Sequence, residues 1–288
     1  MSVINLTVLG ACLWAGYSLL GTAAFPECQA DQPSAGCASK SEAACGQMQL
    51  GVQEFSRARF NAALAHFQKA ADFDPGDPDA HLYVGMSYFQ LYVPGGDSPE
   101  NIRLAEQAIQ ALENVLLIDS QNPTALNTLA LICYNMKNFD KAKEYQSRRI
   151  DVDPENPEPY YWIGVLDWSL CNRRRMRLRE ELNLSLPPDP NNPERLAPLP
   201  EDARLRLIGD NSLLVSEGIE KLKKAIELKP DYDDAMAYLS LTYREKLDLE
   251  TDEAARASDL QTADQWVQRA IEVRKRAAQS NPSNASQR

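Results

Sequence analysis

The chain has 288 residues, of which 44% are hydrophobic and 25% are charged, and its formal net charge at pH 7 is -11. A chain of this length and composition can bury a sizeable core, which excludes disorder throughout. The negative net charge excludes nucleic acid and an anionic membrane surface as the main partner, because contacts with phosphate groups need a basic surface. We therefore expect contact with a membrane only through the N-terminal segment.

The N-terminal segment is apolar and uncharged. The first 26 residues carry no charged side chain and include the apolar stretch from Leu6 to Phe25. This pattern predicts an export signal over residues 1–24, with Thr22-Ala23-Ala24 as the small residues before the cleavage site, although no Lys or Arg precedes the apolar run. Two alternatives stay open: a lipidated Cys12 in Leu9-Gly10-Ala11-Cys12, and an uncleaved membrane anchor. All three place the rest of the chain outside the cytoplasm, in the periplasm or cell envelope.

The cysteines fit an exported protein. Five of the six would remain after cleavage: Cys28, Cys37, Cys45, Cys133 and Cys171. The first three lie close enough in sequence for one local disulfide, which an oxidising compartment permits, and the pairing stays open.

The chain repeats itself with a period of 34 residues, the separation of Gly51 from Gly85 and of Ala130 from Gly164. Large apolar residues and a closing proline follow at fixed distances, as in Phe67 and Pro75 of the first copy. Small residues let two helices approach, large ones fill the remaining volume, and proline stops the second helix. This pattern resembles the tetratricopeptide repeat, and the chain is similar to uncharacterised exported bacterial proteins of that family.

The resemblance implies an all-α solenoid of about five helical hairpins in a right-handed superhelix. The array is expected over residues 39–279, after a linker at 25–38 and before a disordered tail at 280–288. Its units are placed at about 44–77, 78–122, 123–156, 157–232 and 233–278. Insertions of 11 residues in the second and fifth units and of 42 in the fourth, at about 170–212, are expected on loops. A capping box from Ser39 to Glu42 is predicted to start the first helix, and Ser98 is predicted to cap a helix that begins at Pro99.

Members of the family line a concave groove with residues from the first helix of each hairpin. Counted from the first residue of each unit given above, the ninth and twelfth positions of this chain are mostly apolar or aromatic. The predicted partner-binding residues are Phe55, Met86, Phe89, Leu131, Tyr134, Val165, Trp168 and Arg244. They predict a protein or peptide partner with an apolar segment or helix. The alternative is that these side chains pack inside the superhelix.

The long insertion opens with a run of arginines. Arg173, Arg174, Arg175 and Arg177 are a candidate patch for an acidic partner segment or for phosphate groups. The alternative is a longer first helix whose arginines pair with Glu180, Glu181, Glu201 and Asp202, leaving a solvated surface.

No catalytic or metal-binding pattern is present in the sequence. The patterns G-x-x-x-x-G-K-[ST], H-E-x-x-H and G-x-S-x-G are absent, and His66 and His81 fall at places that the repeat explains. We therefore predict a non-enzymatic scaffold or adaptor of the bacterial cell envelope, with no cofactor and no metal. A membrane-tethered assembly factor and an enzyme with its site in the 170–212 insertion are the alternatives.

Overall fold

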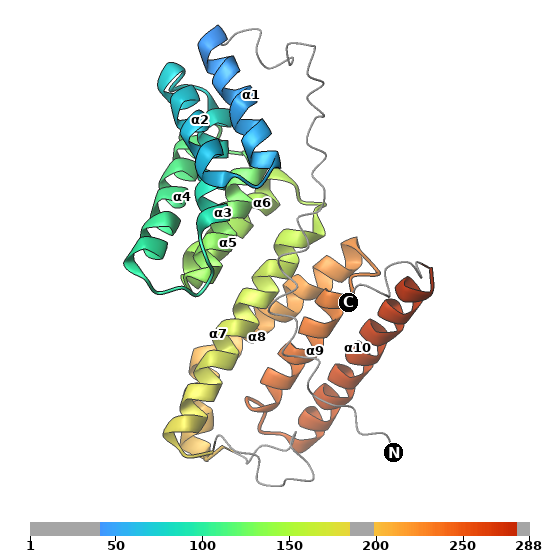
Figure 1. The fold of residues 1–288 in the computed structure, drawn as a ribbon. Helices are drawn as coiled ribbons and strands as arrows, with labels where there is room; N and C mark the ends of the chain where they lie inside the picture. The colour runs from blue at the N-terminus through green and yellow to red at the C-terminus, as the bar shows by residue number, and fades with distance from the viewer. Residues whose placement is uncertain (1–40, 185–198, 281–288) are drawn as a thin grey trace.

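The computed structural model describes residues 41–184 and 199–280, and every regular element in these two ranges is an α-helix (Figure 1). The helices are α1 (Glu42–Ser56), α2 (Phe60–Phe73), α3 (Pro78–Leu91), α4 (Pro99–Ile118), α5 (Pro123–Asn135), α6 (Phe139–Val152), α7 (Pro157–Glu181), α8 (Glu201–Leu228), α9 (Asp233–Leu247) and α10 (Glu253–Ser280). The prediction of an all-α fold is confirmed. The predicted export signal, Cys12, the predicted linker and residues 281–288 of the predicted tail lie outside the described residues.

Four helices begin with proline after a polar capping residue. The helices α3, α4, α5 and α7 have proline in their first turn, and their N-cap side chains accept a hydrogen bond from a backbone N–H of that turn; these caps are Asp77, Ser98, Asn122 and Asn156. Proline presets the helical φ angle, and a cap contributes about 1 kcal/mol. The predicted cap at Ser98 is confirmed.

The cap of α1 differs from the prediction. The Ser41 hydroxyl accepts a hydrogen bond from the Ala44 N–H at 3.1 Å, which makes Ser41 the N-cap, and Ser39 of the predicted capping box lies outside the described residues. A serine three residues before an amide can reach it from the N-cap position, so the helix begins at Glu42.

Consecutive helices pair into antiparallel hairpins, and each hairpin packs on the next along the chain. The close approach within hairpins depends on small residues in the first helix. A Cβ atom added to Gly51, Gly85 or Gly164 would lie 2.4–2.6 Å from side-chain carbons of Phe67, Leu112 and Leu222 respectively. Each of these large side chains on the second helix is fully buried. Glycine therefore sets the distance between the two helices.

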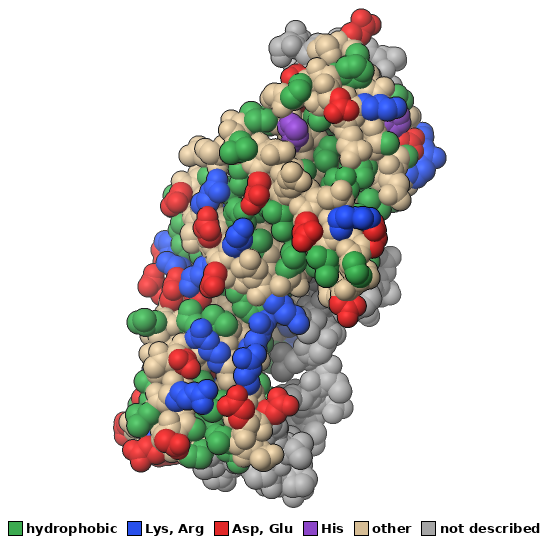
Figure 2. All heavy atoms as spheres, turned by 90° about the vertical axis from the view of Figure 1, so that its left-hand side faces the viewer, with side chains coloured by type: hydrophobic (Ala, Val, Ile, Leu, Met, Phe, Trp, Pro, Cys, Tyr) green, Lys and Arg blue, Asp and Glu red, His purple; other side chains and the backbone are tan. Residues whose placement is uncertain are grey.

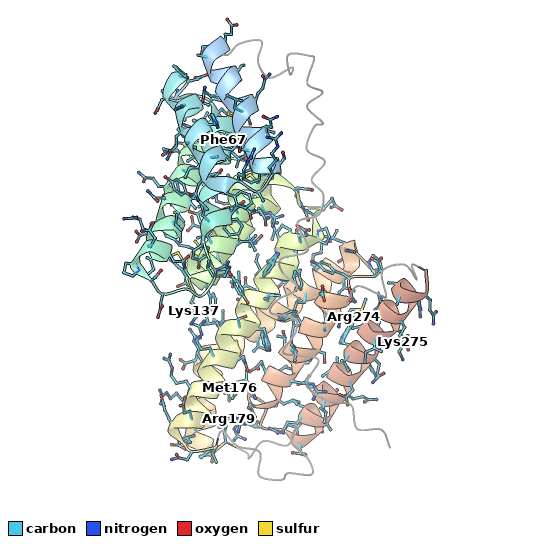
Figure 3. All side chains as sticks on the ribbon, viewed as in Figure 1. Phe67, Lys137, Met176, Arg179, Arg274 and Lys275 are labelled. Atoms are coloured by element: carbon cyan, nitrogen blue, oxygen red, sulfur yellow. The ribbon has the colours of Figure 1, made fainter. Side chains whose placement is uncertain are left out.

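The core continues through the stack of hairpins. Phe67 is buried near the N-terminal end, where its ring stacks on Tyr83 with centroids 4.8 Å apart (Figure 3). Leu112 and Leu129 belong to the central cluster, and Leu222 belongs to the C-terminal one. The array has the architecture of a helical-hairpin solenoid, in which each unit is stabilised mainly by its neighbours.

The insertions lengthen helices more than they lengthen loops. The helices α4, α7, α8 and α10 contain 20, 25, 28 and 28 residues. The expectation that the inserted residues lie on loops is wrong for these parts of the chain, because the inserted stretches carry helix-favouring residues such as Arg, Leu, Glu and Ala. In Figure 1, α7 accordingly runs from the upper hairpins far down the lower half of the molecule. Residues 185–198 of the long insertion lie outside the described residues.

Candidate functional site

A run of aromatic side chains crosses the first helices of three hairpins. We call Phe139, Tyr134, Trp162, Tyr161, Tyr238 and Trp168 the aromatic run. Their rings contact one another in that order, with centroid distances between 5.3 and 5.7 Å. All six side chains are partly exposed. The run therefore joins α5, α7 and α9, together with the start of α6, in one connected layer.

The predicted partner-binding residues have different surroundings in the structure. Tyr134 and Trp168 belong to the aromatic run. Phe55 contacts the rings of Phe60, Phe67 and Tyr83 and so belongs largely to the N-terminal packing. Arg244 is bound by Asp264 of α10 at 2.9 Å. Phe89, Met86 and Leu131 are partly exposed on α3 and α5.

Val165 has to be removed from the predicted surface. Its side chain is 1% exposed, so it is part of the interior between α7 and its neighbours. The ninth position of the fourth unit is therefore interior, whereas Met86 and Leu131 at the ninth position of the second and third units are partly exposed.

Other members of the aromatic run escaped the sequence prediction. Tyr161, Trp162 and Tyr238 are neither at the ninth nor at the twelfth place of a unit. A signal was nevertheless present, because Tyr83, Trp162 and Tyr238 all occupy the sixth place of their units. A recurring aromatic at one repeat position indicates a shared packing layer.

The arginine run of α7 divides between two faces of the helix. Arg175 and Arg179, four residues apart, point to α9, where Arg175 Nε lies 2.8 Å from Glu245 and Arg179 lies 2.8 Å from Asp248. Residues four apart share one helix face, which explains why these two act together. Arg175 is thus an internal ion-pair residue and has to be removed from the predicted acidic-partner patch. The alternative of a longer first helix is confirmed by α7, but Arg175 pairs with Glu245 instead of with the predicted Glu180, Glu181, Glu201 or Asp202.

The ion pairs between α7 and α9 are buried. Arg179 is 1% exposed and Glu245 is 3% exposed. Burial raises the pKa of Glu245 to about 7, and the attraction of Arg175 opposes this shift. A buried pair of this kind fixes the position of the lower part of α7, which carries Met176 and Arg179 in Figure 3, against α9.

The remaining arginines of the run line a cleft on the other face. The arginine cleft lies between α7 and α8 and has a volume of about 350 Å³. Its lining comprises Leu170, Arg173, Arg174, Arg177, Leu178, Glu181, Arg206, Leu207 and Asp210. The structure therefore brings Arg173, Arg174 and Arg177 together with Arg206, which lies about 30 residues further along the chain. Sequence spacing gave no signal for Arg206.

A third cluster binds α6 to α7 and α8. Lys143 Nζ donates hydrogen bonds to Asp167 and Glu217, each at 2.8 Å. Asp167 is 2% exposed, and burial raises its pKa to about 6 against the attraction of Lys143. These ion pairs link the three helices to one another. Because the acidic groups are paired with the basic one, the cluster does not present an acid and a base at one surface for catalysis.

The cysteines do not provide a reactive group in the described part of the chain. Burial raises the pKa of Cys133 to about 11 and that of Cys171 to about 12, so both thiols stay protonated at neutral pH. Cys45 is disulfide-bonded, and Cys28 and Cys37 lie outside the described residues. Within residues 41–184 and 199–280, no group of three or more His, Cys, Asp and Glu side chains is placed to hold a metal ion.

None of the described helices combines the length and the apolar character that crossing a bilayer requires. This finding does not cover the N-terminal segment, which lies outside the described residues.

Comparison with known proteins gives one family and a set of similar structures. A family model described as tetratricopeptide repeat matches residues 104–165. A crystal structure of MamA protein has a TM-score of 0.54, with 17% identity over 83% of this chain and 95% of that one. MamA from Desulfovibrio magneticus RS-1 has a TM-score of 0.54, with 14% identity over 82% of this chain and 98% of that one.

One curated protein is also similar in sequence. The Protein CTR9 homolog of Arabidopsis thaliana is 26% identical over 183 residues, which are 63% of this chain. The match spans only 15% of that protein's length. At these identities the structures show a shared fold. The family model, the 34-residue period and the stack of helical hairpins together support a protein of the tetratricopeptide-repeat family, with the family match itself confined to residues 104–165.

Proposed function

We propose that this protein is a non-enzymatic scaffold that binds a segment of a partner protein over the first helices of its hairpins. The observation that carries the proposal is the aromatic run, which presents six partly exposed rings across α5, α7 and α9 and the start of α6. Aromatic side chains offer large apolar area at little conformational cost and are enriched at interfaces between proteins. An amphipathic helix or an apolar extended segment is the occupant that suits such a layer.

Two further side chains extend the proposed surface toward the N-terminus. Met86 and Leu131 are partly exposed and belong to none of the packed clusters of the described residues. A flexible Met side chain adapts to different partner surfaces, as is common at binding sites. Replacing these two residues should consequently change binding more than it changes stability.

We further propose that the protein is exported and acts in the bacterial cell envelope. The support is the uncharged apolar segment before Pro26 and the small residues Ala23 and Ala24 ahead of it. Mass spectrometry of the protein isolated from its source cells tests this: an N-terminus at Phe25 supports cleavage by signal peptidase. A lipid-modified Cys12 would instead support the tethered assembly factor, and an intact N-terminus in a membrane fraction would support an anchor.

The scaffold proposal is tested by partner capture followed by a binding measurement. The chain without residues 1–24 is used to capture proteins from envelope extracts, and a captured protein is then purified and titrated by calorimetry. We expect the Met86→Gln, Leu131→Gln double variant to bind it at least tenfold more weakly than the wild type. The Tyr134→Ala, Trp168→Ala variant is expected to lose binding as well.

The control is Phe73→Ala. Phe73 is 55% exposed on α2, away from the aromatic run, so this change removes an exposed aromatic ring without altering the proposed surface. Circular dichroism establishes that each variant keeps its helical content. Equal affinity of the wild type and the folded Met86→Gln, Leu131→Gln variant would refute the proposed surface.

A further inference from the structure

The arginine cleft concentrates positive charge in a strongly acidic protein. Four guanidinium groups and two carboxylates line it, whereas the whole chain has a net charge of -11. Figure 2 shows several Lys and Arg side chains next to one another in its lower half, at the height of α7 and α8. General attraction to the protein surface cannot bring an acidic ligand to this chain, so any such binding depends on a local site.

The guanidinium groups of the cleft are only weakly neutralised. Arg177 is exposed and makes no hydrogen bond or ion pair within the described residues. Arg206 lies 3.9 Å from Glu181, and the two side chains are 67% and 50% exposed. Exposed pairs at this distance contribute little, so Arg206 can exchange Glu181 for a ligand, and Arg177 can bind a ligand without giving up a partner. On the same helix, by contrast, Arg175 and Arg179 bind Glu245, which is buried, and Asp248, which is largely buried.

The other two arginines are held in place by neutral partners. The Arg173 guanidinium lies over the Phe139 ring, 4.5 Å from its centroid. Arg174 donates to the backbone oxygen of Asp210 and to Asn211 Oδ1. Neutral partners fix the orientation of a guanidinium without cancelling its charge, which lowers the entropic cost of binding an anion. Leu170, Leu178 and Leu207 lie between the charges and strengthen hydrogen bonds to them by excluding water.

The spacing of the arginines favours a carboxylate-bearing peptide. Arg173 and Arg177 are four residues apart on α7, which places their Cβ atoms roughly 5–6 Å apart. In an extended peptide, side chains two residues apart lie on one face at roughly 6.6 Å, twice the rise per residue of a strand. Acidic side chains at alternate positions can therefore face Arg173 and Arg177 together, with Arg174 and Arg206 beside them. Guanidinium groups bind carboxylates through two parallel hydrogen bonds.

We propose that the arginine cleft binds an extended acidic segment of a partner protein, with Asp or Glu at alternate positions. The inference rests on the proposed scaffold function, because it names the chemistry of a partner segment. The contact between Arg173 and Phe139 joins the cleft to the aromatic run, so one partner can place an apolar part on the rings and an acidic part in the cleft.

The test uses a labelled nine-residue peptide that alternates glutamate with serine, and a matched peptide with glutamine in place of glutamate. Fluorescence anisotropy is measured with the chain lacking residues 1–24 at low ionic strength. We expect binding of the glutamate peptide that weakens as salt increases. The Arg177→Gln, Arg206→Gln double variant is expected to bind it at least tenfold more weakly.

A control with the same change of charge is Arg103→Gln, Arg276→Gln. These arginines are 62% and 78% exposed on α4 and α10, and each is paired with a carboxylate of its own helix, Glu100 or Glu272. This control variant should bind the glutamate peptide as the wild type does. Absence of binding by the wild type, equal binding by the cleft variant, or equal binding of the glutamine peptide would each overturn the proposal. A phosphoserine peptide of the same spacing that binds more than tenfold tighter would overturn the assignment to carboxylates.

The peptide assay separates this inference from the scaffold proposal. It needs no natural partner, and the Met86→Gln, Leu131→Gln variant should bind the glutamate peptide normally. If the peptide does not bind, the proposed arginine cleft site is refuted and the proposed aromatic surface is unaffected. If partner capture is lost while the peptide still binds, only the proposed aromatic surface is contradicted.

Discussion

At the scale of single residues, glycine has two opposite roles in the helices of this chain. Gly164 lies against Leu222, where an added Cβ would be within 2.9 Å of three side-chain carbons. Leu222 is fully buried and has no room to move away. Gly209 in α8, by contrast, has no heavy atom within 4 Å of such a Cβ. The first glycine is required by packing, while the second only weakens its helix.

Alanine substitutions at these two glycines should therefore have opposite signs. Gly164→Ala should lower the free energy of unfolding, because overpacking a core costs about 1–3 kcal/mol and the gain in helix propensity is at most about 1 kcal/mol. Gly209→Ala should raise it by about 0.5–1 kcal/mol, because alanine favours the helix and meets nothing. Urea denaturation measures both. The packing argument is wrong if Gly164→Ala is as stable as Gly209→Ala.

Buried Asp167 makes stability depend on pH. Its pKa rises from 3.8 to about 6 on folding, so the folded state binds the proton more tightly than the unfolded state does. The folded protein is thus favoured by this group below about pH 4, and that stability is lost as the pH rises through about 6. The shift of roughly two units corresponds to about 3 kcal/mol.

Asp167→Asn should remove this dependence on pH. As the pH rises from about 4 to 6, the wild type should lose about 2–3 kcal/mol of stability relative to the variant. Thermal or urea unfolding of dilute protein at a series of pH values measures the difference. The control is Glu217→Gln, which removes the 39% exposed carboxylate of the same Lys143 cluster. Parallel pH profiles of the wild type and Asp167→Asn would contradict the prediction.

At the scale of elements, ion pairs hold the extended half of α7. The helix continues to Glu181, and its lower part is linked to α9 through Arg175 and Arg179. The small apolar cluster around Leu178 and Leu207 and the hydrogen bonds of Arg174 to α8 also hold this end of the α7–α8 hairpin. The position of this end, and with it the arginine cleft, depends on the buried pairs.

Arg179→Ala should loosen this end of the hairpin selectively. Removing one member of a buried ion pair costs about 3–5 kcal/mol, because the other charge is left uncompensated. Hydrogen exchange should speed up in residues 170–181 and in the start of α8, with α1 to α4 unchanged. A double-mutant cycle with Asp248→Asn should show coupling between the two sites. Additive effects of the two substitutions would show that the pair does not stabilise the hairpin.

At the scale of the whole molecule, the stack of hairpins predicts unfolding in parts. Each hairpin contacts mainly its neighbours, so a local defect weakens a segment rather than the entire chain. The N-terminal hairpin α1–α2 has a neighbour on one side within the described residues, and the central hairpin α5–α6 has one on each side. Stability should therefore be lower at the N-terminal end.

Phe67→Ala should separate the N-terminal hairpin from the rest. Truncating a fully buried phenylalanine costs about 3–5 kcal/mol, and the rings that stack near Phe67 are those of Phe55 on α1 and Tyr83 on α3. We expect an early unfolding transition for residues 42–73 in hydrogen exchange, with the helices from α5 onward retaining wild-type protection. The comparison is Leu129→Ala in the central cluster, which should lower protection from hydrogen exchange in the hairpins on both sides of α5–α6. Uniform loss of protection in Phe67→Ala would show that the array unfolds as one unit.

The sequence by itself determined the repeat. The places of Gly51, Gly85 and Gly164, the prolines that open α3, α5 and α7, and the capping at Ser98 all follow from local rules of helix geometry and packing. Such signals recur with each unit, and recurrence separates them from chance. The fold class could be predicted for this reason.

Tertiary structure alone decided which side chains meet. Arg175 and Arg177 are both arginines of one run, yet the first binds Glu245 of α9 and the second lines the cleft with Arg206. Val165 and Trp168 both occupy predicted groove places, but one is buried and the other remains partly exposed. These outcomes depend on the length and direction of α7 and α8 relative to their neighbours. The contacts arise between residues tens of positions apart, and no local periodicity specifies them.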